Sequence, residues 1–172
     1  MNNKKNIPAL AGGVVCIVLL TLLDQITKTI AVNKLSQEPY VLIDGVFEFH
    51  YIQNYGSAWG MLSGKTILLI TVTLIMMTLI IYAFIQTPKN KKYFLLSVCE
   101  IVLFSGALGN FIDRIRLGYV RDFIYFSLID FPIFNVADCY VVISAFIACI
   151  LVVFVYKDED FSFLSIKRKV HS

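Results

Sequence analysis

Residues 66–88 read TILLITVTLIMMTLIIYAFIQTP and contain no charged side chain. A helix needs about 20 apolar residues to cross the hydrocarbon core of a bilayer, and this stretch is long enough. Three further segments pass the same test: residues 6–23, 93–112 and 139–156, of which the second carries a single charge, Glu100. The sequence therefore predicts an all-α membrane protein, a bundle of four transmembrane helices forming one domain over residues 1–172.

The composition agrees with a membrane protein. Of the 172 residues, 58% are hydrophobic and 16% are charged, and the mean hydropathy is +0.77, which is more apolar than one small soluble core requires. The formal charge is +3, but the basic residues flank the apolar segments and form no stripe, so we expect no nucleic-acid partner. The four cysteines lie within or at the edges of the apolar segments without metal-ligand spacing, and are interpreted as small apolar residues.

The distribution of Lys and Arg predicts how the chain crosses the membrane. Most of the basic residues lie before the first segment, between the second and third, and after the fourth. Because cytoplasmic loops carry the excess of Lys and Arg, we expect these three parts, including both termini, to be cytoplasmic. The two remaining connections, residues 32–65 and 113–138, then face outward and hold seven of the twelve acids.

The first outward connection is predicted to contain a β-hairpin. Asp44 and Gly45 lie between two short apolar runs, and an Asp-Gly pair supplies the positive φ angles of tight hairpin turns. Aromatic residues at 47, 49 and 51 alternate with polar ones, which favours a sheet with one apolar face at the lipid interface. His50 is interpreted as a surface residue of this hairpin. The second outward connection is rich in aromatic residues and is predicted to be an interfacial loop that covers a site.

Two aspartates near the last outward connection are candidates for catalysis. Asp122 lies among apolar residues beside the membrane, where an unpaired ionised carboxylate is costly unless its pKa is raised or it shares a proton. Asp138 follows Asn135 by three residues, which is also the pattern of a helix N-cap with an acid at the third helical position. Capping and catalysis are compatible, and two carboxylates at a water–membrane boundary suit peptide hydrolysis.

Other polar residues have two interpretations each. Helical spacing puts Asn110, Asp113 and Arg114 on one face, as part of a site or as a solvated helix end, with Gly106 and Gly109 allowing close packing.

Asp24 and Lys28 are spaced as an ion pair that either braces the structure or takes part in catalysis. Asn54 and Gly56 belong either to a site or to a simple turn before the second span.

Taken together and in order, these motifs resemble the lipoprotein signal peptidase family, also called signal peptidase II. The motifs are Asp24-x-x-x-Lys28, Asn54-x-Gly56-x-Ala58-Trp59, Gly109-Asn110-x-x-Asp113-Arg114, Val120-x-Asp122-Phe123 and Phe134-Asn135-x-Ala137-Asp138. Each motif is weak alone, but five in order at the ends of four spans are specific. The resemblance covers the chain from the first span through the fourth.

The resemblance implies a metal-independent aspartyl endopeptidase of the bacterial cytoplasmic membrane, without a cofactor. Its substrate is expected to be a prolipoprotein whose cysteine already carries diacylglycerol, and cleavage is expected just before that cysteine. Asp122 and Asp138 match the catalytic pair of the family. The remaining matched positions are expected to position substrate or brace the site (Asn54, Gly56, Asn110, Arg114 and Asn135) or to support it (Asp24, Lys28 and Asp113). We expect a monomer whose other partners are membrane lipids.

Two other functions fit four spans. A noncatalytic membrane scaffold predicts that the two aspartates are dispensable, and a small ion-coupled transporter predicts internal repeats and polar residues near the midplane. Only Glu100 lies deep within a predicted span, about 15 Å along the helix from Asn110. It matches no position of the family pattern, and we expect it to be hydrogen-bonded within the bundle.

Overall fold

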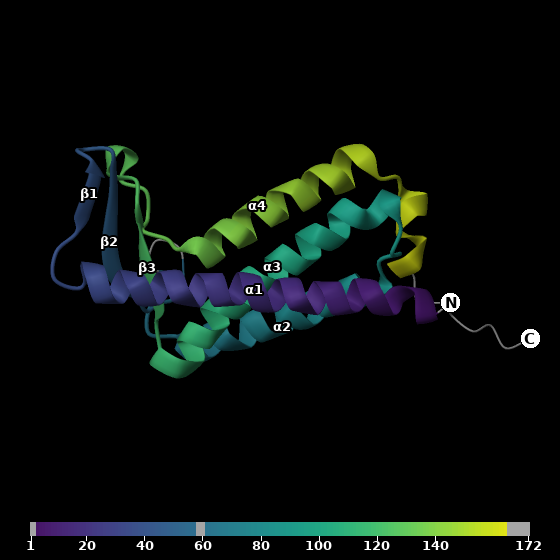
Figure 1. Cartoon of the computed structure of the whole chain (residues 1–172), viewed down its shortest axis with the longest axis horizontal. Coiled ribbons are helices and arrows are strands. Elements are labelled where there is room, and N and C mark those ends of the chain that lie inside the picture. The colour runs from purple at the N-terminus through teal and green to yellow at the C-terminus, as the bar shows by residue number, and fades with distance from the viewer. Residues whose placement is uncertain (1–2, 58–60, 165–172) are drawn as a thin grey trace, which may run out of the picture.

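A computed structural model describes residues 3–57 and 61–164 of the chain. Within these residues, four helices are long and apolar enough to cross a membrane: Ile7–Leu35, Thr66–Gln86, Lys91–Leu117 and Val136–Val155. A three-stranded antiparallel sheet lies at one end of the bundle, and both ends of the described chain lie toward the other end (Figure 1). The predicted class, four transmembrane helices with a small sheet, is confirmed.

Helices α1 and α3 extend further than the uncharged segments predicted, whereas α2 ends at Gln86, two residues before the predicted end. Helix α1 (Asn3–Leu35) continues past Asp24 and Lys28, where the prediction ended at residue 23. Both side chains are fully buried and paired at 3.0 Å, so these charges face the bundle interior and do not end the span. Helix α3 (Phe94–Leu117), which follows the short 3₁₀ turn η2 (Lys91–Tyr93), likewise continues past residue 112 to a left-handed Gly118.

Helix α4 (Val136–Ile150) begins three residues before the predicted segment and continues as a π-helical turn, η4 (Leu151–Val155). Its start is set by Asn135, whose side chain accepts a hydrogen bond from the backbone N–H of Asp138 at 3.1 Å, while the Asp138 carboxylate accepts from the backbone N–H of Asn135 at 3.1 Å. This reciprocal capping box is the N-cap that the sequence predicted. It places the Asp138 carboxylate within the first turn of α4.

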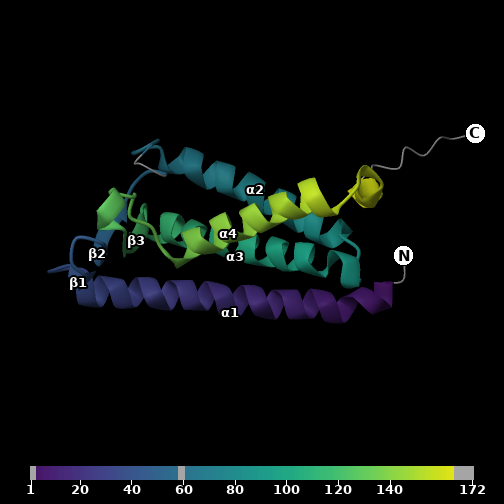
Figure 2. The same cartoon turned by 90° about the horizontal axis from the view of Figure 1, so that it is seen from above.

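Helix α3 is the centre of the bundle, because it packs against α1, α4 and α2 (Thr66–Gln86) (Figure 2). Two glycines permit the close approach. A Cβ at Gly106 would lie 2.5 Å from the carbonyl oxygen of Ala137 in α4, and a Cβ at Gly109 would lie 2.5 Å from the carboxylate of Asp24 in α1. The predicted packing role of these glycines is thereby confirmed.

The sheet has the order β1-β2-β3, with β1 (Tyr40–Ile43), β2 (Phe47–Asn54) and β3 (Val120–Tyr125). The predicted hairpin is β1–β2; its turn closes through a hydrogen bond from the Val46 N–H to the Ile43 carbonyl, and Gly45 takes a φ of 66°. The prediction of a loop was wrong for residues 120–125, which pair with β2 as a third strand. Long-range pairing with a strand some 70 residues earlier has no local signal in the sequence.

The opposite end of the bundle is closed by aromatic packing. Tyr93 stacks on Tyr156 with ring centroids 5.3 Å apart, and Phe163 of the 3₁₀ segment η5 (Asp158–Leu164) meets Tyr93 edge-on. Lys92 and Asp160 pair across the same junction. These contacts join the start of α3 to the end of α4 at the end far from the sheet.

Candidate active site

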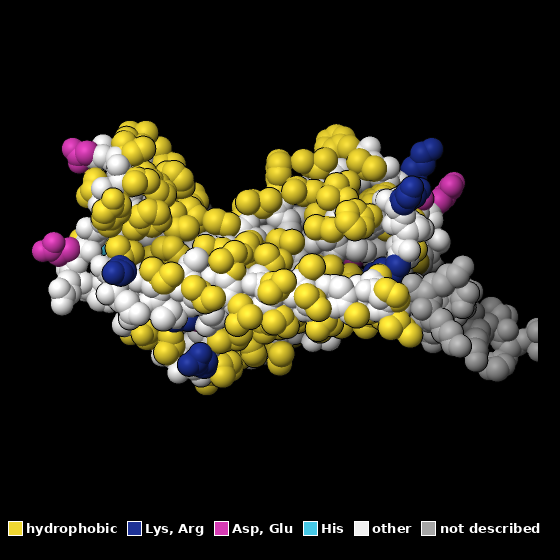
Figure 3. Space-filling model, in the orientation of Figure 1, with side chains coloured by type: hydrophobic (Ala, Val, Ile, Leu, Met, Phe, Trp, Pro, Cys, Tyr) yellow, Lys and Arg dark blue, Asp and Glu magenta, His cyan; other side chains and the backbone are white. Residues whose placement is uncertain are grey.

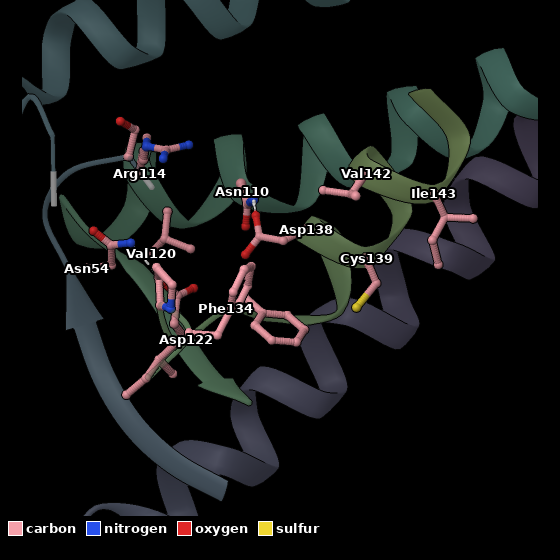
Figure 4. A pocket seen from close by; sticks show the side chains of 14 residues that line it. Asn54, Asn110, Arg114, Val120, Asp122, Phe134, Asp138, Cys139, Val142 and Ile143 are labelled. Carbon is pink, nitrogen blue, oxygen red and sulfur yellow. Dashed lines mark hydrogen bonds between the residues drawn. The ribbon is translucent and has the colours of Figure 1, made fainter. Parts of the chain in front are cut away.

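Asp122 and Asp138 line one cavity of about 520 Å³ between the sheet and the bundle (Figure 4). Asp122 comes from the middle of β3, and Asp138 from the first turn of α4. Asn110 of α3 lies beside Asp138, and Asn54 at the end of β2 lies on the Asp122 side (Figure 4). Residues from three distant parts of the chain therefore meet at this cavity.

Three asparagine side chains hold the two carboxylates. Asp122 accepts hydrogen bonds from Nδ2 of Asn135 at 2.6 Å and from Nδ2 of Asn54 at 2.8 Å. Asp138 accepts from Nδ2 of Asn110 at 2.7 Å, in addition to the backbone N–H of Asn135. Asn135 thus contacts both acids, through its side chain on one and its backbone on the other. This arrangement fixes the orientation of each carboxylate relative to the other.

Beneath the asparagines lies a buried cluster of charges. The Lys28 ammonium donates to Oδ1 of Asn110 at 2.8 Å and pairs with Asp24 at 3.0 Å and with Asp113 at 3.5 Å. The side chains of Lys28, Asp24 and Asp113 are all 0% exposed. Because Lys28 holds the oxygen of the Asn110 amide, the nitrogen of that amide is turned toward Asp138.

Arg121 and Gln25 complete this cluster, and neither residue was predicted from the sequence. Nη2 of Arg121 lies 2.7 Å from Oδ1 of Asp113, and the same nitrogen donates to Oε1 of Gln25 at 2.9 Å. The Gln25 amide also donates to Asp24 and Asp113, at 3.1 Å each. The sequence held no local signal for Arg121, because alternation along a strand places it and residues 120–125 were predicted as a loop.

Arg114 ties the first connection to the site. Its Nη2 donates to the carbonyl of Gly56 at 3.2 Å, and the Gly56 N–H donates to Oδ1 of Asn54 at 2.9 Å. Arg114 also lines the cavity. The predicted residues Asn54, Gly56 and Arg114 therefore form one unit, whereas Ala58 and Trp59 of the same motif lie outside the described residues.

The surroundings of Asp122 favour its protonated form. Asp122 is only 1% exposed to solvent. Burial, and then the negative charge of Asp138, raise the pKa of Asp122 to about 7, while hydrogen bonds from Asn54 and Asn135 act in the opposite direction. A carboxylic acid with this pKa holds a proton at near-neutral pH and can release it, which is a property of groups that transfer protons.

The cavity combines this polar floor with apolar walls. Phe131, Phe134, Val142 and Ile143 are among its lining residues. Val142 and Ile143 are 65% and 58% exposed on α4, so the cavity opens beside the surface of an apolar span. Figure 3 shows the hollow between the sheet and α4, with mostly hydrophobic side chains on its visible walls. The arrangement can bind a ligand that is apolar at one end and polar at the other.

Two further predictions from the sequence concern Glu100 and the absence of a metal. Glu100 is buried, and its Oε1 accepts a hydrogen bond from Thr87 at 2.8 Å at the α2–α3 connection, so the expected hydrogen bond within the bundle is confirmed. Among the described residues no three His, Cys, Asp or Glu side chains converge as metal ligands would. The absence of a metal and of a cofactor stays a prediction.

Comparison with known proteins identifies the family. The family model described as "Signal peptidase (SPase) II" matches residues 16–154. The chain belongs to this family. A lipoprotein signal peptidase of Caldanaerobacter subterraneus subsp. tengcongensis is 39% identical over 143 residues, covering 82% of this chain and 95% of the relative. One from Clostridium tetani is 37% identical over 163 residues, covering 92% and 99%.

A solved structure described as a bacterial membrane enzyme superposes on the signal peptidase II fold seen here with a TM-score of 0.72. It shares 32% sequence identity and covers 93% of this chain and 94% of its own. With four apolar helices and this family membership, the protein is a multi-pass bacterial membrane protein and a peptidase. The resemblance drawn from the five motifs is confirmed.

Proposed function

We propose that the protein is an aspartyl endopeptidase that removes the signal peptide from diacylglyceryl-modified prolipoproteins, cleaving just before the lipidated cysteine. The observation that carries the proposal is that Asp122 and Asp138 line one cavity beside an apolar span. The relatives named lipoprotein signal peptidase support the choice of substrate.

The proposed reaction uses the two carboxylates as a pair that shares one proton. The ionised carboxylate accepts a proton from a water molecule as the water oxygen adds to the carbonyl carbon of the scissile peptide bond. The protonated carboxyl gives its proton to the carbonyl oxygen. When the tetrahedral intermediate collapses, the C–N bond breaks, the leaving nitrogen takes the proton that came from water, and a hydroxyl of the intermediate returns its proton to the pair. The raised pKa of Asp122 supports a shared proton at neutral pH, and the pair titrates as a unit.

The neighbouring polar groups have supporting tasks in this scheme. Asn54, Asn110 and Asn135 keep the carboxylates oriented, so that a water molecule can contact both acids. Arg114 is a cation on the cavity wall and is proposed to bind a backbone carbonyl of the substrate. Lys28 acts through Asn110 and is a positioning residue. Preorganised donors of this kind stabilise charge that develops during the reaction.

The apolar wall formed with Val142 and Ile143 suits the lipid on the substrate cysteine. Since the diacylglyceryl group stays in the bilayer, the scissile bond reaches the membrane surface beside the dyad, and confinement replaces part of the binding energy. The cluster Lys89, Lys91 and Lys92 lies at the end of the bundle opposite the sheet, which by the positive-inside rule supports cytoplasmic termini and an extracytoplasmic site in the cytoplasmic membrane. One chain supplies all the site groups described above, in keeping with a monomer.

The test compares cleavage of a diacylglyceryl-modified precursor with cleavage of its unlipidated form by the purified protein. We expect cleavage of the lipidated precursor only, and loss of at least 1,000-fold in rate for Asp122→Asn and for Asp138→Asn. Asp130→Asn is the matched control, because Asp130 has a φ of 48°, a conformation that asparagine tolerates, and does not line the cavity. Equal cleavage of both precursors would refute selection of the lipid. Undiminished cleavage by both dyad variants would refute the dyad.

A further inference from the structure

A second cavity, of about 260 Å³, lies between the end of α1 and the sheet. The part contributed by α1 consists of Thr27, Ile30, Ala31, Lys34 and Leu35. Their spacing places them on one face of the helix, so the cavity is a groove that runs along the helix axis. Seven residues separate Thr27 from Lys34, which corresponds to a groove about 10 Å long.

This groove is separate from the candidate active site, although the two share a strand. Along β3 the side chains alternate, and Asp122 lines the larger cavity while Phe123 lines the groove. Phe49 of β2 and Tyr40 of β1 complete the wall opposite α1. The two cavities therefore lie on opposite faces of the sheet.

The groove has a charge at one end and an apolar wall along its length. Lys34 lies in the last turn of α1, at the end of the candidate span, where headgroups of a bilayer would be found. Lys34 is exposed, and it forms no ion pair within residues 3–57 and 61–164. Below it, Ile30 is 54% exposed on the surface that continues along α1 toward the bilayer interior. A ligand that fits must be anionic at the membrane surface and apolar below it.

We propose that this groove binds one acyl chain of an anionic phospholipid whose phosphate contacts Lys34. The volume is below the roughly 300–1,000 Å³ of pockets that enclose a whole drug-sized ligand, so a single chain enters and the rest of the lipid stays in the bilayer. The diacylglyceryl group of a substrate is a poorer match because it has no phosphate for Lys34. The site adds a lipid-binding function and does not depend on the peptide-cleavage chemistry.

The test uses a single tryptophan as a reporter of the lipid beside it. Ile30→Trp is made together with Trp59→Phe, which removes the chain's one native tryptophan. The protein is reconstituted in phosphatidylcholine vesicles that contain a small fraction of phosphatidylglycerol with brominated chains, which quench nearby tryptophan. The matched reporter is Val72→Trp on α2, because Val72 is 49% exposed, close to the 54% of Ile30, and lies outside the groove.

We expect brominated phosphatidylglycerol to bind at Ile30→Trp about fivefold more strongly than brominated phosphatidylcholine. One lysine near an anionic lipid contributes about 1 kcal/mol of binding free energy, which corresponds to this ratio. Adding Lys34→Gln should reduce the ratio to near one. Lys65→Gln, which removes an exposed lysine near the same end of the bundle, should leave the ratio unchanged.

Three results would overturn the proposal. A ratio near one at Ile30→Trp means that the groove does not select an anionic lipid. An equal ratio at the α2 reporter means that anionic lipid is enriched around the whole protein. If Lys65→Gln reduces the binding ratio as much as Lys34→Gln does, the preference for anionic lipid arises from the general positive charge and not from Lys34. None of these readouts requires cleavage, so the lipid site and the peptidase assignment fail or stand separately.

Discussion

Lys28→Met is expected to lower the free energy of unfolding by about 3–5 kcal/mol, the usual cost of removing one partner from a buried ion pair. The side chain is completely buried, and its ammonium contacts Asp24, Asp113 and Asn110. Asp113 keeps the guanidinium of Arg121 at 2.7 Å. In the Lys28→Met variant, Asp24 keeps only neutral hydrogen-bond donors, so the buried cluster carries one uncompensated negative charge.

A second substitution tests this account of the loss. In Lys28→Met/Asp24→Asn the buried cluster is again neutral, since the Asp113–Arg121 pair remains. An asparagine at 24 also keeps an oxygen that can accept the Ala137 N–H, which now donates to Asp24 at 3.0 Å. We expect the double variant to recover at least half of the lost stability, or roughly 2 kcal/mol, because the two positions are coupled.

The measurements are the melting temperature in detergent micelles and the rate of prolipoprotein cleavage. At about 2–4 °C per kcal/mol for a chain of this size, the single variant should melt roughly 10 °C below the wild type. The double variant should regain melting temperature but not the full rate, because the Asn110 oxygen loses its charged donor and keeps only the Asn135 amide, at 3.2 Å. The Asn110 amide then orients Asp138 less firmly. A single variant that melts within 2 °C of the wild type, or a double variant as unstable as the single one, refutes the reasoning.

Three further outcomes are expected. Gly109→Ala places a methyl group 2.5 Å from the Asp24 carboxylate and should cost roughly 1–3 kcal/mol, whereas Gly12→Ala, which meets nothing within 4 Å, should leave the melting temperature unchanged or raised. The folded-state pKa of Asp122 is about 7, above the ordinary value of about 3.9, so the contribution of this carboxyl to stability is lost as pH rises from 3.9 through 7. Asp122→Asn should therefore melt higher relative to wild type at pH 8 than at pH 5. An equal difference in melting temperature at both pH values would contradict the raised pKa. Glu100→Gln should cleave within twofold of the wild-type rate, since its side chain does not line the cavity of Asp122 and Asp138, and a large loss would show that the buried acid takes part.

Features encoded locally could be predicted from the sequence. Hydropathy located the four spans, the Asp-Gly pair located the hairpin, and the spacing of Asn135 and Asp138 located the start of α4. The span boundaries were too short wherever a charge is buried and paired, as at Lys28, because a count of charges does not record what each charge contacts. Buried pairing is a property of the bundle and not of one helix.

By itself, the sequence determined which residue types lie at the ends of the spans, since hydropathy and helix capping act over a few neighbouring residues. Only the tertiary structure decided that β3 joins the sheet, that Arg121 and Gln25 complete the charge cluster, and that Asn135 holds Asp122 while capping the helix of Asp138. These contacts join residues that are distant along the chain, and they form only once the helices pack and the backbone of each segment is fixed in space.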